Sequence, residues 1–356
     1  MATRTRALTY TAAQAARVAF YGAHYLAARI LARETFSEID ALPHRIPPLG
    51  AMLKSMRALF ARDWKNVEAG LYPMPVDLAQ ETRRAMASVW YLADIPKVVA
   101  RQRRNGHSEV PKASDLPRYY RQNFHFQTDG YLSDRSARIY DFQVESLFAG
   151  TAAAMRRQVF VPLAAHFADR KNVTLLDVAA GTGGFLAFVK SAKPDWKTIA
   201  LDLSEPYLAR ARRALSKYKN VEFVAAPAEA MKLPDASADA VTAIYLFHEL
   251  PPKVRAAVAA EIARVLKPGG IFVLGDTIQY GDIPEFDGLI DVFPHLLHEP
   301  YYSTYARTDL DALFGKAGLK RVSTDFAYLT KIAVFGKPRT RKRGRSFSAQ
   351  PASRLR

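Results

Sequence analysis

The chain has 356 residues, of which 49% are hydrophobic and 24% charged, a composition typical of a globular protein and not of a disordered or membrane-spanning one. It contains no cysteine, which excludes disulfide scaffolds, thiolate zinc sites and cysteine nucleophiles. The formal net charge is +17, but seven basic residues and no acid lie in residues 339–356, so the rest of the chain carries +10. That charge favours polyanions, anionic lipid head groups or an acidic substrate as partners.

Residues 1–110 have a helical pattern that is interrupted by a turn-rich segment, residues 43–50. The longest early apolar stretch, Val18–Leu31, contains His24 and Arg29 and is too short to span a membrane. It also lacks a signal-peptide cleavage pattern, so we expect a cytoplasmic protein. The alternative is a transit peptide, because the first segment is rich in arginine and has no acid before Glu34.

The segment after the turn predicts an amphipathic helix with a basic side. Its apolar residues recur at helical spacing: Met52, Leu53, Met56, Leu59, Phe60, Trp64 and Val67. Its other faces carry Lys54, Arg57, Arg62 and Lys65. We expect the apolar face to pack on the rest of the protein, and the alternative is peripheral contact of these basic N-terminal helices with a membrane surface.

An aromatic segment, Tyr119–Tyr131, precedes two predicted helices over residues 135–148 and 152–165. Ser133 is placed to cap the first of them through the amide of Ser136.

Strands and helices alternate from Asn172 to about Lys337, which predicts an α/β fold with a mostly parallel sheet covered on both faces. A helix over residues 252–266 ends abruptly at the Lys-Pro-Gly-Gly segment 267–270. Residues 326–329 and 331–335 predict a terminal antiparallel hairpin, and the Arg-rich tail from Pro338 is expected to be disordered. The predicted strands before the hairpin are residues 174–180, 198–203, 221–225, 240–247 and 271–276.

The first of these strands runs into a glycine turn, Gly181-Thr182-Gly183. Glycines allow close approach of a ligand, but such a loop is shared by several nucleotide-binding families. A carboxylate at the end of the second strand, Asp202, faces the same crevice and can accept hydrogen bonds from both ribose hydroxyls. The alternative is that Asp202 caps the helix that begins near Glu205.

The motifs occur in the same order as in class I S-adenosylmethionine-dependent methyltransferases and resemble them. They are most similar to the motifs of the ubiquinone and menaquinone biosynthesis group. Residues 175–183 resemble the first motif, with Asp177 closing the strand, and Asp202 stands at the position of the ribose-binding acid. Residues 227–234 resemble the adenine-side loop, and 238–241 and 264–270 the fourth strand and the turn into the fifth. The resemblance covers about residues 172–337 and implies a Rossmann-like seven-stranded sheet with S-adenosyl-L-methionine as cofactor.

Two residues depart from the family pattern. Ala179 replaces the first glycine of the usual triplet, which is tolerable if this residue keeps ordinary strand angles. Pro227 stands where an aspartate is common, so Glu229 or the backbone of Ala228 must contact the adenine. The residues that we expect to bind the cofactor are Asp177, Ala179, Gly181, Gly183, Asp202, Leu203, Ala228, Glu229 and Tyr245.

We divide the chain into a helical cap region (1–160), a methyltransferase domain (161–337) with a substrate lid inserted at 277–306, and the basic tail (338–356). Methyl transfer needs an aligned acceptor and, for some acceptors, a base. His248 is a candidate base that Glu249 would orient, and the alternative is that His248 packs against the cofactor or caps the next helix. The expected catalytic residues are His248, His298 and Tyr302. The expected substrate-binding residues are Tyr120, His125, Tyr131, Glu249, Tyr301 and Tyr305.

The lid also contains His295, His298 and Glu299, a spacing that is weak evidence for a metal, and we predict no metal site. We expect an enzyme that methylates a small, apolar or aromatic molecule at oxygen, carbon or nitrogen, since no Asn-Pro-Pro-Tyr type sequence follows the fourth strand. One alternative is an RNA or protein methyltransferase that uses the basic surface, although nucleic acid is the less favoured partner because no RNA-binding module is present. The other alternative is a catalytically silent scaffold that binds a nucleoside.

Overall fold

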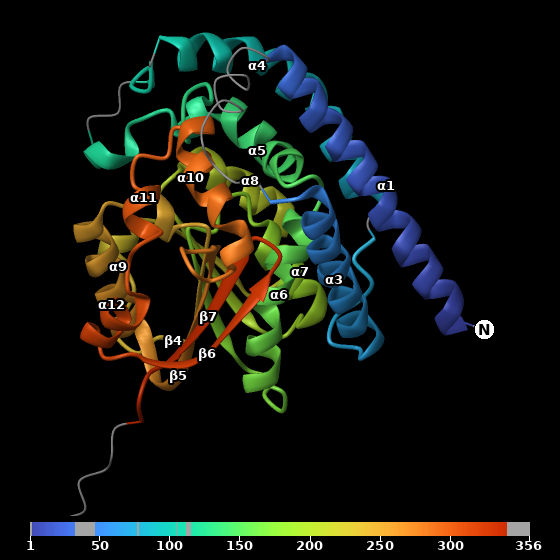
Figure 1. The fold of residues 1–356 in the computed structure, drawn as a ribbon. Helices are drawn as coiled ribbons and strands as arrows, with labels where there is room; N and C mark the ends of the chain where they lie inside the picture. Colours follow the sequence, from blue (N-terminus) through green and yellow to red (C-terminus); the bar gives the residue numbers. More distant parts are fainter. Residues whose placement is uncertain (1, 33–46, 77, 105, 112–114, 340–356) are drawn as a thin grey trace, which may run out of the picture.

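The computed structural model describes residues 2–32, 47–76, 78–104, 106–111 and 115–339 (Figure 1). Its centre is a seven-stranded sheet with the order β3-β2-β1-β4-β5-β7-β6, parallel from β3 to β5 and antiparallel at β7 and β6. The mostly parallel seven-stranded sheet with a terminal hairpin is therefore confirmed. The strands are β1 Thr174–Val178, β2 Lys197–Asp202, β3 Val221–Ala225, β4 Ala238–Ile244, β5 Leu266–Thr277, β6 Lys320–Ala327 and β7 Thr330–Gly336.

Two apolar cores cover the two faces of this sheet. Leu175 and Leu176 of β1 are fully buried in different cores, because successive side chains of a strand point to opposite faces. The helices α6 (Ala152–His166), α7 (Gly184–Ala192) and α8 (Glu205–Leu215) contribute to the first core, and α9 (Pro252–Val265) and α12 (Leu310–Lys316) contribute to the second. The sheet is covered on both faces, as predicted.

Several strand boundaries differ from the prediction, and β6 begins at Lys320, well before the predicted start at Phe326. Residues 267–270 belong to β5, which begins directly after α9, and a register shift between Ala238 and Ala240 accommodates them. The strand β4 ends at Ile244, because Tyr245 has a φ of 55° and residues 247–249 form the 3-10 helix η4. The hairpin turns at Tyr328, with a φ of 56°, so Leu329 is not part of β6 and β7 begins at Thr330.

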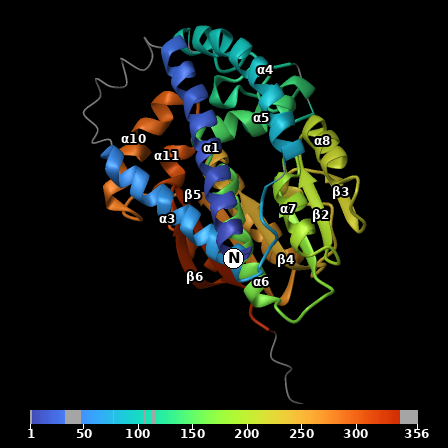
Figure 2. The same cartoon turned by 90° about the vertical axis from the view of Figure 1, so that its right-hand side faces the viewer.

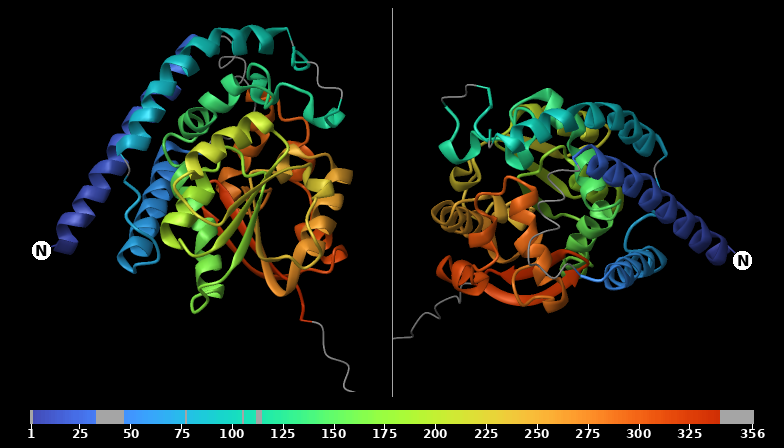
Figure 3. Two further views of the ribbon diagram at one scale, coloured as in Figure 1. Left: turned by 180° about the vertical axis from the view of Figure 1, so that it is seen from behind. Right: turned by 45° about the horizontal axis from the view of Figure 1, so that its top comes forward.

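Helices precede the sheet, as the sequence predicts: α1 (Ala2–Leu31), α3 (Leu49–Glu68), α4 (Leu78–Arg103) and α5 (Asp134–Leu147). The helices α1 and α4 lie side by side and both contact α5 (Figure 3). Ser133 caps α5 by accepting a hydrogen bond from the Ser136 amide at 3.1 Å, which confirms the predicted cap. The predicted disordered tail lies outside the described residues from position 340 onwards, as does the turn-rich segment from 43 to 46.

The amphipathic helix α3 packs against α6 (Figure 2). Met56, Leu59 and Val67 on its apolar face are buried in the first core, so the predicted packing on the protein is confirmed. None of the described helices is long and apolar enough to cross a membrane.

A buried ion pair joins these N-terminal helices to the sheet layer. Asp63 of α3 is fully buried and accepts hydrogen bonds from Arg157 of α6 at 2.9 and 2.6 Å. Tyr10 of α1 donates to the same carboxylate at 2.5 Å, and Tyr72 donates at 2.6 Å. The carboxylate therefore ties three helices together at one point.

Replacement of Asp63 by alanine leaves the Arg157 guanidinium buried without a counter-charge. We expect the free energy of unfolding, measured by urea denaturation, to fall by about 3 to 5 kcal/mol. The control is Glu205→Ala, which breaks an ion pair with Arg212 whose two side chains are 58% and 42% exposed and should cost at most about 1 kcal/mol. Equal effects of the two substitutions would contradict this account of the helical region.

Candidate functional site

A cleft opens at the carboxyl ends of β1, β2 and β4, where ligands bind in open α/β sheets. Six of the nine residues expected to bind the cofactor line it: Ala179, Gly181, Asp202, Leu203, Ala228 and Tyr245. Three of the six residues expected to bind the substrate line it as well: Tyr120, Tyr131 and Glu249. The structure thus brings the glycine loop and the aromatic segment together around one space.

The glycine loop follows an unusual backbone path. Ala179, Gly181 and Gly183 have φ values of 60°, 56° and 78°. The condition that Ala179 keep ordinary strand angles is not met, since this alanine adopts the left-handed conformation that glycine tolerates more readily. A side chain at Gly183 would meet the Cβ atom of Ala211 at 3.0 Å, so this glycine also allows α7 to pack on α8.

Asp202 is buried at the end of β2 and fixes the loop. Its carboxylate accepts the Gly181 amide at 2.7 Å and the Ser204 amide at 2.8 Å. Burial raises the pKa of this carboxyl to about 6, although the two amide hydrogen bonds oppose the shift. The alternative role as a helix cap is wrong, because the side chain of Ser204 caps α8 through the Tyr207 amide.

The other three residues expected to bind the cofactor, Asp177, Gly183 and Glu229, are not among those that line the described cleft. Asp177 is buried and accepts a hydrogen bond from Thr242 at 2.7 Å, and burial raises the pKa of its carboxyl to about 7. Glu229 accepts the hydroxyl of Tyr119, whose oxygen lies 2.8 Å from both carboxylate oxygens. An adenine contact by Glu229 would therefore have to share this carboxylate with Tyr119.

His248 lies on η4 and is buried, with its Nδ1 atom 2.6 Å from the carboxylate of Asp276. Asp276 is thus the orienting partner, whereas the expected partner Glu249 lies 3.9 Å from Nε2. Burial would lower the pKa of the ring, but the charge and hydrogen bond of Asp276 outweigh it and raise the pKa to about 9. A ring that is protonated at neutral pH is a poor general base, so this geometry favours the packing role that the sequence left open.

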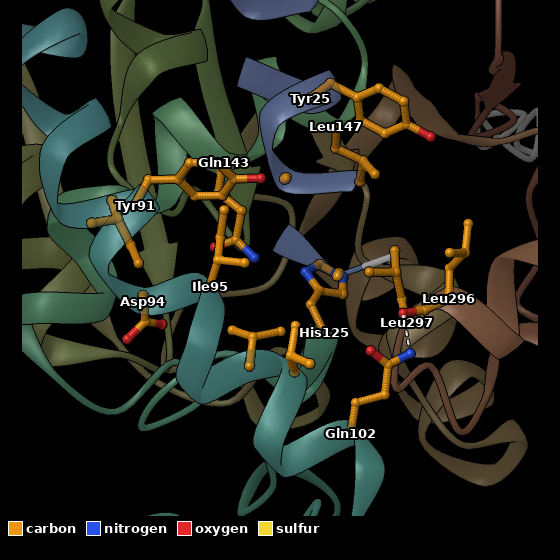
Figure 4. A pocket seen from close by; sticks show the side chains of 15 residues that line it. Tyr25, Tyr91, Asp94, Ile95, Gln102, His125, Gln143, Leu147, Leu296 and Leu297 are labelled. Atoms are coloured by element: carbon orange, nitrogen blue, oxygen red, sulfur yellow. Dashed lines mark hydrogen bonds between the residues drawn. The ribbon is translucent and has the colours of Figure 1, made fainter. Parts of the chain in front are cut away.

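Glu249 reaches the cleft and accepts a hydrogen bond from the Tyr131 hydroxyl at 2.6 Å. Burial and the charge of Glu299 raise the pKa of Glu249 to about 7. Glu299 in turn contacts His125, the residue that we expected at the substrate. His125 lines a second, mostly apolar cavity between α1, α4, α5 and residues 296–297, and its ring points into that space (Figure 4).

The other residues of the predicted lid do not line the described cleft. The ring of His298 bonds to the side-chain oxygen of Gln122 at 2.8 Å, and burial lowers the pKa of His298 to about 4. Tyr302 and Tyr305 are buried in the apolar cores, and Tyr305 donates to the carbonyl oxygen of Thr277. The backbone oxygen of Tyr301 accepts from Arg255. The side chain of His295 lies outside the described residues.

Comparison with known proteins identifies a methyltransferase domain. Residues 175–270 match the family model described as a methyltransferase domain. The ubiquinone/menaquinone biosynthesis C-methyltransferase of Methylobacterium nodulans is 34% identical over 45% of this chain and 65% of its own length. The carboxy-S-adenosyl-L-methionine synthase of a Shewanella species is 29% identical over 44% of this chain and 69% of its own length. The crystal structure of a putative methyltransferase from Bacillus halodurans is 26% identical, with a TM-score of 0.38 over 49% of this chain and 72% of that chain.

The chain contains a methyltransferase domain, which resembles the class I S-adenosylmethionine-dependent methyltransferases. Its methyltransferase domain resembles the ubiquinone and menaquinone biosynthesis type, as the motifs indicated. The chain spans less than two thirds of the length of the Methylobacterium enzyme, and residues before position 175 lie outside the matched domain.

Several residues that line the cleft were not expected from the sequence. These are Tyr140, Tyr207 and Leu250, whereas Tyr119 and Phe124 belong to the aromatic segment that the sequence singled out. The Arg156 guanidinium lies 5.9 Å from the ring of Tyr140 and 5.6 Å from the ring of Tyr245, close enough for cation–π attraction. Tyr140 and Arg156 lie on helices before the first strand, and helical spacing alone does not indicate which of their neighbours faces the cleft.

The glycine loop provides a test with a built-in control. Gly183→Ala should lower the melting temperature and weaken S-adenosylhomocysteine binding, because its φ is positive and its new Cβ would press on Ala211. Gly184→Ala changes the next residue, the first of α7, where nothing lies within 4 Å. We expect this variant to keep both properties. Both properties are measured by calorimetry. Comparable losses of melting temperature and of S-adenosylhomocysteine affinity in the two variants would refute the packing argument.

Proposed function

We propose that this protein transfers a methyl group from S-adenosyl-L-methionine to a small, apolar or aromatic acceptor held in the tyrosine-lined cleft. The observation that supports this proposal is the cleft itself, in which the buried carboxylate of Asp202 and the glycine loop face Tyr120, Tyr131 and Tyr140. The carboxylate and the glycine loop suit a nucleoside, and the tyrosines suit a flat, apolar molecule.

The loop and Asp202 would bind the nucleoside half of the cofactor. Asp202 already orders the Gly181 and Ser204 amides, and its carboxylate borders the cleft, where ribose hydroxyls can donate to it. Ala228 and Leu203 line the side of the cleft on which the adenine is expected. When bound, the cofactor supplies a sulfonium-activated methyl group, so the protein has mainly to align the acceptor.

The aromatic segment would form the acceptor side and exclude water. Tyr131 is 7% exposed and Phe124 is 1% exposed, and their rings stack with centroids 5.3 Å apart. Tyr131 also packs edge-on against Tyr140 and Tyr207. A wall of this kind fits a small apolar molecule better than a nucleic-acid strand, which would need a basic groove along its backbone.

The proposal predicts that ionised Asp202 is needed for cofactor binding. Asp202→Asn should weaken S-adenosylhomocysteine binding, measured by calorimetry at pH 8, by about 1 to 3 kcal/mol, because hydrogen bonds to a charged acceptor are lost. Asp195→Asn removes an exposed carboxylate of the same domain and serves as the control. Unchanged affinity in Asp202→Asn would refute this role.

The same experiment has a pH arm. The raised pKa of Asp202, about 6, means that the carboxylate is ionised above pH 6 and becomes protonated as the pH falls through that value. If only the ionised form binds, the affinity of the wild-type chain should be about tenfold lower at pH 5 than at pH 8. This pH dependence should be much weaker in Asp202→Asn, and an equal dependence in both proteins would assign it to another group.

A further inference from the structure

Three ligand-type side chains converge beside the cleft from distant parts of the chain. His125 comes from the 3-10 helix η2 (Phe124–Phe126), Glu249 from η4, and Glu299 from the segment between α10 (Asp287–Leu296) and α11 (Tyr302–Tyr305). One nitrogen of His125 and one carboxylate oxygen of each glutamate all lie within 4.8 Å of one another. Zinc ligands lie about 2.0 to 2.2 Å from the metal, so two ligands of one ion are at most about 4.4 Å apart. The limit of 4.8 Å is close to this value, so small side-chain rotations would bring the three atoms onto one ion.

Glu299 carries the strongest sign of a missing partner. Its side chain is fully buried, and its Oε1 atom contacts the Nε2 atom of His125. Its Oε2 atom is buried and has no hydrogen-bond partner among the described residues. Buried carboxylate oxygens are normally paired or bound to a metal, so this free oxygen points to a ligand.

The charges around the cluster agree with that interpretation. Glu249 and Glu299 place two carboxylates in one buried region, and the one hydrogen bond that Glu249 accepts from the described residues comes from the neutral hydroxyl of Tyr131. The ring of His248 lies 3.9 Å from Glu249 and is already paired with Asp276. Among the described histidines, His125 is the one that contacts Glu299, and a divalent cation would neutralise the negative charge of the two carboxylates.

We propose that His125, Glu249 and Glu299 form a binding site for a divalent first-row cation such as Mn²⁺ or Zn²⁺. One imidazole and two carboxylates suit this group of metals, and three protein ligands leave positions open for water or another ligand. Tyr131 holds Glu249 as an outer hydrogen-bond partner of a metal ligand does. The sequence drew attention to a different set of possible ligands, His295, His298 and Glu299. Only Glu299 belongs to the proposed site, and His298 bonds to Gln122 instead.

The position of the site suggests what the ion would do. Glu249 lines the cleft that contains Asp202, and His125 lines the adjoining apolar cavity (Figure 4). An ion held between them would bind an oxygen atom of the acceptor and favour its deprotonated form. This role rests on the proposed methyl transfer, whereas binding of the ion does not.

The test is a titration of the full chain with Mn²⁺ after treatment with a chelator and its removal. Free Mn²⁺ is measured by electron paramagnetic resonance, and Zn²⁺ binding is measured by calorimetry in parallel. We expect one ion per chain, and affinities at least about tenfold lower in Glu299→Gln and Glu249→Gln, because changes even at outer partners of metal ligands cost that much. Glu222→Gln, which alters an exposed carboxylate paired with Lys197, is the matched control and should bind as the wild type does.

Two further measurements keep the outcome decisive. Thermal melts show whether each variant folds, and His125→Asn provides a third ligand variant whose side chain tolerates the positive φ of 54° at this position. Absence of stoichiometric binding of either ion to the wild-type chain, or equal affinity in the folded ligand variants and the control, overturns the proposal. Wild-type binding of S-adenosylhomocysteine is measured separately, so a failed cofactor site and a failed metal site give different results.

Discussion

The hydrogen bond from the Gly181 amide to the buried carboxylate of Asp202 is the constraint on which the site depends. It joins the carboxyl ends of two adjacent parallel strands and fixes the loop between β1 and α7. Ser204 extends the connection, since its amide donates to Asp202 and its hydroxyl donates to the Tyr131 carbonyl at 2.6 Å. The Tyr131 hydroxyl then donates to Glu249. One continuous set of hydrogen bonds therefore runs from the glycine loop to the tyrosine-lined side of the cleft.

The helical region before the sheet is part of this arrangement and not an independent attachment. Tyr131 and Tyr140, which line the cleft, lie directly before and within α5. The helix α5 is held by α1 and α4, and the Asp63–Arg157 pair anchors α3 to α6. The tyrosine wall is positioned by helices that lie outside the matched methyltransferase domain, so its shape is a property of this chain rather than of the shared core.

Local sequence patterns predicted the elements well because each depends on nearby residues. Buried apolar runs located the strands, and Ser133 was identified as a cap from the spacing to Ser136. Contacts between distant residues were not accessible in this way. His248 was assigned to Glu249, its neighbour in the chain, whereas the fold places it on Asp276, 28 residues away. His125 and Glu299 are 174 residues apart, and no spacing rule joins them. The left-handed angle of Ala179 was missed because alanine carries no signal for it, unlike glycine.

The central claim is that the nucleoside of the cofactor lies against Asp202 in the tyrosine-lined cleft. A crystal structure of the chain with S-adenosylhomocysteine tests this claim most directly. The account predicts the ribose hydroxyls at hydrogen-bond distance from the Asp202 carboxylate and the homocysteine sulfur inside the cleft that Tyr131 and Glu249 line. A nucleoside bound elsewhere, for example in the apolar cavity beside His125, or a cleft that stays empty at saturating ligand, would contradict it.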